Sequence, residues 1–543
     1  MAALILIPFS FLILGMFWTT QPGFPGEFTL DHVTTAFTDA STFPYLANSL
    51  IFATGSTILS ITLATFFAWV AHRTDTPGRK LLDALPLLLF MIPSLLFDIG
   101  WTFLLSPKIG LINLFLMQLL GLPAPPFNIY TIWGMIWAQT VTSTPVAYLL
   151  ISGAFVNMDP TLEESAQVSG AGRLRILRTV TLPLLYPSLI ATGALNFMIA
   201  LSSFETPVII GLPGNVHVYM STIFEEIQLR TPPNHGLATA LAFVNVLLSA
   251  AIVAFYVRST RKLAKYVVVT GKGYRPGVTR LGWARYLALG IALAYVFVGI
   301  VLPIITMLLV SLVPFYTVTA GNPFSDLSLK NYSEAIGNPL VGSATVNSLL
   351  LAFGSAAIST LMAALFSYAA IKTNLRGKRM FEIVGVIPLL FPGVIFSLAL
   401  LWTSITVYRP LYSTIWILVI AYIVVLLPRA MRAITNSIIQ LHSELEEAAF
   451  ISGAGWRKMF QTINLPLLKP ALLNSFTLAF IQAYQILGPA ILLITPGTLI
   501  LPALVLRFWI GGQLVQLAAA SMIFGGIAVA IVLAAKYIFR MKV

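Results

Sequence analysis

The sequence contains no cysteine and very little charge. Asp, Glu, Lys and Arg together make up 9% of its 543 residues, whereas soluble domains carry roughly a quarter. The absence of cysteine excludes disulfides, thiolate zinc sites and cysteine-ligated iron–sulfur clusters. The five histidines form no His-x3-His or HExxH pattern, so a metal centre in this chain is not expected. A chain this poor in charge cannot cover a globular surface that faces water.

Apolar residues dominate instead. They make up 58% of the chain, and the mean hydropathy is +0.91. Apolar runs of about 20 residues, the length that crosses a bilayer, recur throughout. We therefore predict an all-α polytopic membrane protein with about twelve transmembrane helices, the first of them retained because residues 2–18 lack the basic start of a signal peptide. The expected spans are 1–18, 46–71, 81–105, 128–156, 188–211, 236–257, 284–313, 344–371, 380–406, 411–438, 471–497 and 514–540.

The net charge is +13, and the charged residues are distributed as in a membrane protein rather than as in a nucleic-acid-binding protein. Basic residues cluster in alternate short segments between apolar runs, and the intervening segments hold most of the acids. The densest stretch, Arg258 to Arg285, has no acidic residue. This alternation fits the positive-inside rule, so we expect no nucleic-acid partner and place the basic stretch, a linker over 258–283, in the cytoplasm.

The chain is an internal repeat. Asn48-Ser49-Leu50 opens an apolar segment that recurs from Asn347-Ser348-Leu349, 299 positions later. Residues 163–190 match residues 446–473, 283 positions later, with about half of the aligned residues identical. We therefore predict a first half over 1–257 and a second over 284–543, homologous, with the same topology and parallel in the membrane.

Each half contains one segment between spans that is built as helix, glycine turn and helix. The segments are 159–187 and 443–470. Asp159 is placed to cap the first helix, and paired glycines permit a sharp turn with positive φ. The second helix is expected to be short and amphipathic, ending before Pro183 or Pro466. It would then lie on the membrane surface or insert into a partner, and both readings stay open here.

The segments carry a recognisable motif. The pattern E-A-A-x3-G-x9-I-x-L-P is present from Glu447 to Pro466, and from Glu164 to Pro183 with Ser and Val at two positions. It resembles the cytoplasmic loop of the permeases of binding-protein-dependent ABC importers (type I), where the loop forms coupling helices that sit in the ATPase. The resemblance assigns ATPase coupling to Glu163, Glu164, Ala166, Gly170, Gly172, Leu182, Pro183, Glu446, Glu447, Ala449, Gly453, Gly455, Leu465 and Pro466.

The resemblance extends to partners and solute. The chain contains no G-x4-G-K-[ST] loop, so it is expected to be no enzyme and to bind no cofactor. ATP and Mg²⁺ would be held by two copies of a separate ABC ATPase, and one fused chain would supply both permease halves. An extracytoplasmic binding protein would deliver the solute to this multi-pass protein of the bacterial inner membrane.

The solute is expected to be ferric iron, because several stretches are most similar to the fused permeases of the ferric-iron branch. They include residues 127–137, 202–214 and 496–513. Thiamine, putrescine or a phosphonate are the alternatives with the same machinery. A secondary transporter driven by an ion gradient is the alternative class.

Two acids lie within or near the apolar runs. Asp98 lies in the middle of a predicted span, and Glu205 lies near the outer end of another. An ionisable side chain inside a membrane is costly and is therefore a candidate for function. Asp98 would line the solute pathway or be a hydrogen-bonded structural carboxylate. Glu205 would line the pathway or contact the binding protein.

Overall fold

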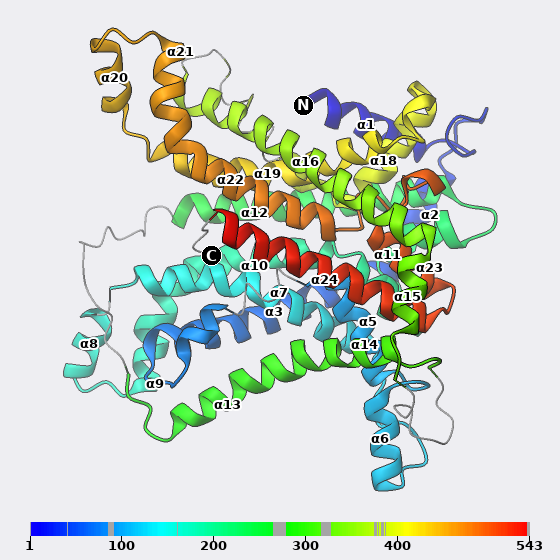
Figure 1. Ribbon diagram of the computed structural model, residues 1–543, viewed down its shortest axis with the longest axis horizontal. Helices are drawn as coiled ribbons and strands as arrows, with labels where there is room; N and C mark the ends of the chain where they lie inside the picture. The colour runs from blue at the N-terminus through cyan, green and yellow to red at the C-terminus, as the bar shows by residue number, and fades with distance from the viewer. Residues whose placement is uncertain are drawn as a thin grey trace. The chain divides into compact units, whose positions relative to one another are not determined.

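A computed structural model describes the chain except at residues 1, 41, 85–91, 160, 264–278, 317–326, 374–376, 378–379, 382–384, 386 and 540–543. Within the described ranges every element is helical, and the only β-type pairs are two isolated bridges. The all-α prediction is confirmed. Figure 1 labels the helices, and their bounds follow.

The elements up to residue 263 are α1 (Ala2–Gly15), α2 (Asp31–Thr38), α3 (Phe43–Arg73), η1 (Arg79–Ala84), α5 (Ser94–Leu105), α6 (Leu111–Leu120), α7 (Ile132–Asn157), α8 (Thr161–Val168), α9 (Arg173–Ile176), η2 (Leu177–Thr181), α10 (Leu182–Leu201), η3 (Pro207–Gly211), η4 (Leu212–Gly214), α11 (Tyr219–Phe224), η5 (Glu225–Leu229) and α12 (His235–Leu263).

The elements after residue 283 are α13 (Ala284–Val296), η7 (Phe297–Val301), α14 (Leu302–Leu312), α15 (Lys330–Gly337), α16 (Pro339–Lys372), η8 (Ile387–Leu390), α18 (Gly393–Val407), η9 (Arg409–Leu411), α19 (Ile415–Ile439), α20 (Ser443–Ile451), α21 (Trp456–Met459), η10 (Phe460–Asn464), α22 (Leu465–Gln485), η11 (Pro496–Thr498), α23 (Leu501–Ile510) and α24 (Leu514–Phe539).

The count of twelve spans is not confirmed. Among the described residues, seven helices are long and apolar enough to cross a membrane, or eight if the bent pair α7 and α8 is counted as one span. Proline accounts for part of the difference. Helix α5 starts only after Pro93 and α18 only after Pro392, with 12 and 15 residues. At about 1.5 Å per residue, helices of these lengths fall short of the roughly 30 Å apolar core of a bilayer.

The chain forms two compact units that cross the boundary between its sequence halves. Unit 1 comprises Met1–Thr38, Ile223–Val246 and Tyr332–Val543, and unit 2 comprises Asp39–Thr222 and Leu247–Asn331. Helix α1 therefore packs in unit 1 against α18 from the second half. The contact is close, because a Cβ added at Gly15 would lie 2.7 Å from the Trp402 ring. The predicted linker over 258–283 falls largely outside the described residues.

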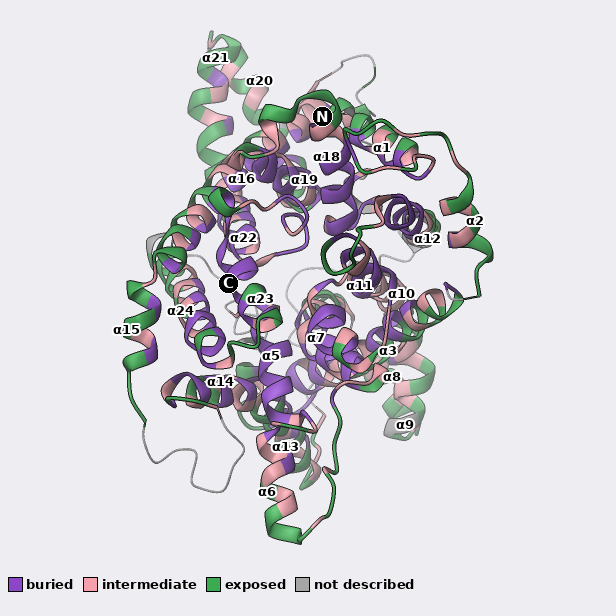
Figure 2. Ribbon diagram, turned by 90° about the vertical axis from the view of Figure 1, so that its right-hand side faces the viewer, coloured by how far each residue is buried: buried purple, intermediate pink, exposed green. Residues whose placement is uncertain are grey.

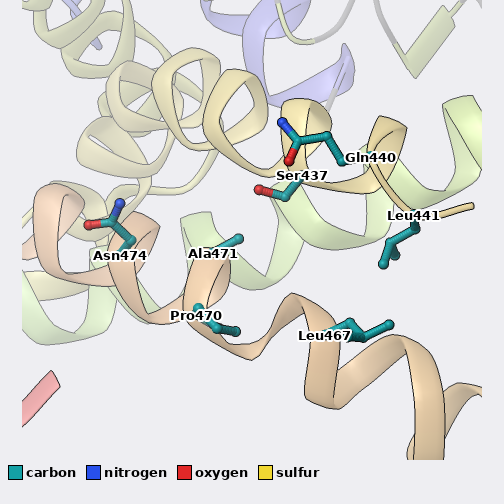
Figure 3. A pocket seen from close by; sticks show the side chains of 7 residues that line it. All are labelled: Ser437, Gln440, Leu441, Leu467, Pro470, Ala471 and Asn474. Carbon is teal, nitrogen blue, oxygen red and sulfur yellow. The ribbon is translucent and has the colours of Figure 1, made fainter. Parts of the chain in front are cut away.

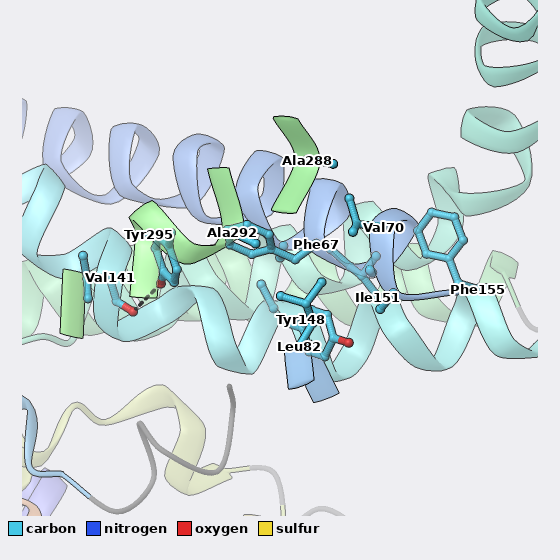
Figure 4. Packing of buried hydrophobic residues seen from close by; sticks show 14 of the residues in the cluster. Phe67, Val70, Leu82, Val141, Tyr148, Ile151, Phe155, Ala288, Ala292 and Tyr295 are labelled. Carbon is cyan, nitrogen blue, oxygen red and sulfur yellow. Dashed lines mark hydrogen bonds between the residues drawn. The ribbon is translucent and has the colours of Figure 1, made fainter. Parts of the chain in front are cut away.

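Unit 2 has a core in which a helix from the second half packs against two from the first (Figure 4). Phe67 of α3 and Tyr295 of α13 lie with ring centroids 4.9 Å apart. The Tyr295 hydroxyl donates to the carbonyl of Val141 in α7, at 3.0 Å. Buried Ala288 and Ala292 lie one turn apart on α13. Small residues at this spacing let helix backbones approach closely, which is how helices associate in lipid.

Candidate functional site

Each predicted coupling segment folds as a helix–turn–helix hairpin, and we call them loop A (159–187) and loop B (443–470). Figure 1 shows the hairpins at α8–α9 and α20–α21. Gly170 and Gly453 both adopt φ +82°. The N–H of Ala171 donates to the carbonyl of Ala166, five residues back, at 3.0 Å. Loop B has the same bond at the same length, from Ala454 to Ala449. This is a Schellman ending, which requires a left-handed residue and so favours glycine.

The second glycine of each pair has a different role from the predicted one. Gly172 and Gly455 are not among the positive-φ residues, and Gly455 precedes α21 with φ −70° and ψ 163°. The sharp turn is therefore made by Gly170 and Gly453 alone. Added Cβ atoms would meet nothing within 4 Å at any of the four glycines, so space is not what requires glycine there.

The prediction that the second helix ends before the proline is wrong. In loop A the helix runs from α9 through the π-helix η2 into α10, so that one span covers Leu177–Leu201. Pro183 lies in the first turn of α10, and the N–H of Leu182 donates to the carbonyl of Leu177, five residues back. The wider π-turn accommodates a proline that would otherwise clash with the preceding turn.

Loop B repeats this arrangement, with η10 leading into α22 at Leu465 and Pro466. Leu465 is 43% exposed and Leu182 is half-buried. Loop A is consequently continuous with a candidate membrane span, and loop B is continuous with α22, which is not among the described helices that are long and apolar enough to cross a membrane.

The start of α8 is capped as predicted. The Asp159 carboxylate accepts from the backbone N–H of Thr161 at 2.9 Å and from the Thr161 hydroxyl at 2.8 Å. These bonds favour the ionised carboxylate and lower the pKa of Asp159 below its ordinary value. The cap satisfies an N–H that no intrahelical carbonyl can reach.

The paired glutamates of each loop separate into two environments. Glu164 and Glu447 are exposed. Glu163 accepts a hydrogen bond from the Thr181 hydroxyl at 2.5 Å, and Glu446 accepts one from the Asn464 amide at 2.9 Å. The sequence motif alone gave all four the same role.

Both loops also expose apolar side chains at equivalent positions, which the motif did not indicate. Val168 at the end of α8 is 89% exposed, and Ile451 at the end of α20 is 88% exposed. Leu162 and Leu445, one further equivalent pair, are each 46% exposed. Helix α8 has no buried residue, as its colours in Figure 2 show. The two residues of each exposed pair lie 283 positions apart, which is the offset of the internal repeat. This spacing is the sequence signal that could have identified them.

A groove of about 380 Å³ opens beside loop B, between the end of α19 and the first turns of α22 (Figure 3). Ser437, Gln440 and Asn474 supply its polar atoms, and Leu467 and Pro470 part of its apolar wall.

The candidate pathway acid Asp98 lies in a buried polar cluster of unit 2. Its side chain is fully buried in α5, and the Thr206 hydroxyl lies 3.0 Å from each carboxylate oxygen. The same hydroxyl lies 3.4 Å from Oε1 of Gln139 on α7. One hydroxyl proton thus faces three acceptor oxygens. Glu205, the neighbour of Thr206, is half-buried.

The equivalent positions of the second half carry no acid. Ser397 stands where Asp98 does, and its hydroxyl donates to Val394 of its own helix at 2.7 Å. Tyr422 replaces Gln139 and donates to the carbonyl of Ile486. Pro489 replaces Thr206. The acidic cluster therefore belongs to one half only, and among the described residues no group of three His, Cys, Asp or Glu side chains could hold a metal ion.

Residues 60–265, which include α7, loop A and α10, match the model of one protein family, the binding-protein-dependent transport system inner membrane component. This stretch of the chain is therefore similar to the permeases of that family. The resemblance expected from the loop motif is confirmed.

Curated relatives extend the similarity over most of the chain. A putative ferric transport system permease of Haemophilus influenzae is 27% identical over 82% of this chain and 68% of its own length. A ferric transport system permease of Actinobacillus pleuropneumoniae is 25% identical over 83% of this chain and 64% of its own. The chain thus spans about two thirds of these two relatives. An Fe(3+)-transport permease of Haemophilus influenzae is 24% identical over 91% of this chain and 90% of its own length.

Among solved structures, a bacterial ABC transporter that imports the acidic polysaccharide alginate is similar. It is 21% identical, with a TM-score of 0.39 over 48% of this chain and 91% of that chain.

Proposed function

We propose that the chain is the membrane-spanning permease of an ATP-driven importer and that its cargo is ferric iron. Loop A and loop B would each seat one subunit of a separate cytoplasmic ABC ATPase, which holds ATP and Mg²⁺. A binding protein outside the membrane would deliver the cargo. Closure of the ATPase pair would pull on both loops and open the spans in alternation.

The observation that carries this proposal is the duplicated hairpin. Both loops have the same Schellman turn, the same π-turn into a long helix, and nearly fully exposed apolar residues, Val168 and Ile451, at their tips. Exposed apolar groups at repeated positions favour a protein partner. The continuity of each loop with the helix that follows it, α10 or α22, would carry the partner's movement into the permease.

Ferric iron is supported by the names of the relatives that match most of the chain. The test is uptake into proteoliposomes that contain the permease, its co-encoded ATPase and its co-encoded binding protein. We expect ATP-dependent uptake of radioactive ferric iron, with no competition from thiamine, putrescine or a phosphonate. Import of one of these instead would refute the cargo. Uptake driven by an ion gradient without ATP would refute the importer.

Asp98 and Glu205 are proposed as groups that the cation meets on its way. Asp98→Asn and Glu205→Gln should each lower uptake at least about tenfold, the effect of roughly 1.4 kcal/mol on a binding step. Association with the ATPase should stay unchanged, because both residues are remote in sequence from the loop tips. Ser397→Ala, the matched position of the second half, should transport normally.

Transport at the wild-type rate in both variants would remove both acids from the pathway. If Glu205→Gln lowers only the affinity for the binding protein, Glu205 is a docking residue on the outer face instead.

A further inference from the structure

Glu163 and Glu446, the half-buried glutamates of the two loops, each form an ion pair with a cation at the end of a long span. Arg73, near the end of α3, places Nε 3.4 Å from Oε2 of Glu163. Lys372, the last residue of α16, places Nζ 3.3 Å from Oε2 of Glu446. The cations occupy equivalent positions, 299 apart, and the glutamates are 283 apart, as the repeat requires. Each pair lies within a single compact unit.

Both cations are also held by the backbone just before their loop. Arg73 donates to the carbonyl of Met158 at 3.0 Å, and Lys372 donates to the carbonyl of Leu441 at 2.9 Å. Met158 and Leu441 are again equivalent positions. Arg73 makes a second bond, to the carbonyl of Phe155 at 3.2 Å.

The second oxygen of each glutamate accepts a hydrogen bond from the π-turn that leads into the next helix, α10 or α22. Thr181 in loop A and Asn464 in loop B are the donors, and both are buried. One carboxylate therefore joins three pieces of chain: the first loop helix, the end of an earlier long span (α3 or α16), and the start of the helix that follows the loop (α10 or α22). We call each such group a latch, comprising Arg73, Glu163 and Thr181 in loop A and Lys372, Glu446 and Asn464 in loop B.

The two latches keep their geometry with different side chains. Loop A has a guanidinium and a hydroxyl where loop B has an ammonium and an amide. In both loops a cation and a hydrogen-bond donor still contact the two oxygens of one glutamate. The four charged side chains are between 2% and 20% exposed. At this burial, a charge whose partner is removed stays poorly solvated, so the pair resists opening.

We propose that Glu163 and Glu446 are positioning residues that lock each loop rigidly to two long helices and do not contact the ATPase. This rests on the proposed function, and it divides the loop glutamates: the exposed Glu164 and Glu447 face the partner, while the latch converts the partner's movement into movement of the spans. Without its latch, a loop would move with the ATPase while the helices attached to it stay in place.

The test compares uptake with ATP hydrolysis in the full complex reconstituted with ATPase and binding protein. Glu163→Gln with Glu446→Gln removes the charges and keeps the side-chain shape. We expect ATPase association to stay within about twofold and uptake per ATP to fall at least about tenfold, a change equivalent to roughly 1.4 kcal/mol. Glu444→Gln changes the same charge at an exposed position of α20 and should leave the ratio unchanged.

A conservative exchange separates a positioning role from a general loss of folding. In loop B, Lys372→Arg supplies the cation type that loop A uses and can still donate to the Leu441 carbonyl, so its uptake per ATP should stay within about threefold of wild type. Lys372→Glu, which places two carboxylates together, should resemble the uncoupled variant. An unchanged ratio in the glutamine variant, or uncoupling by Lys372→Arg as severe as by Lys372→Glu, would overturn the latch.

Loss of ATPase association in the glutamine variant would also overturn it, by making these glutamates contact residues. The wild-type complex distinguishes this failure from failure of the proposed function. If wild-type uptake needs no ATPase, the importer assignment itself fails.

Discussion

Val168→Asp combined with Ile451→Asp should abolish uptake and release the ATPase from the permease. Both side chains are nearly fully exposed at the loop tips, so their replacement removes no contact within the chain. In a complex they would be buried, and loss of a central interface residue costs about 2 kcal/mol or more. For each loop this is at least roughly a thirtyfold loss of affinity. The result is checked by co-purification of the permease with the ATPase in detergent and by measuring the affinity between the two proteins.

Ile336→Asp is the matched control for this prediction. Ile336 is 73% exposed and lies on α15, outside both loops. It should retain the ATPase. Unaltered association and uptake in the double aspartate variant would show that the tips are not seated in a partner.

Gly170→Trp and Gly453→Trp should separate ATP hydrolysis from uptake. Both glycines adopt φ +82° with nothing near the position of a Cβ, so strain rather than collision opposes the new side chain. A left-handed conformation costs other residues about 1–2 kcal/mol. The Schellman turn would open, the angle between the two arms would change, and uptake per ATP should fall roughly tenfold or more.

Gly282→Trp is the control for strain alone. Gly282 also has positive φ and open space around it, and it lies outside both loops. Its ratio of uptake to hydrolysis should match the wild type. Full uptake in both loop variants would contradict a coupling role for the two turns.

Composition and the internal repeat were sufficient to predict the all-α membrane fold and the two hairpins. Helix ends were harder to predict. Pro93 and Pro392 precede short helices, whereas Pro183 and Pro466 lie inside continuous ones. The difference is the π-turn before the second pair, which arises from packing and from backbone hydrogen bonds and leaves no clear mark on hydropathy.

The functional residues that depend on local conformation were predictable from the sequence, whereas those that depend on distant contacts were not. The motif identified Gly170 and Gly453 correctly as turn residues, because a left-handed turn has a strong residue preference. It could not separate Glu163 from Glu164, since the difference depends on Arg73, which lies 90 positions earlier in the chain. The position of Asp98 inside a helix of the membrane region was predicted, but its partner Thr206 was not. Contacts between helices distant in the chain cannot be inferred from the local sequence.

The most direct test of the coupling account is transport by the purified permease in liposomes with and without its ATPase. The account predicts no uptake above the passive leak without the ATPase, and restored uptake when ATPase, ATP and loaded binding protein are all supplied. Import at the full rate by the permease alone would contradict it.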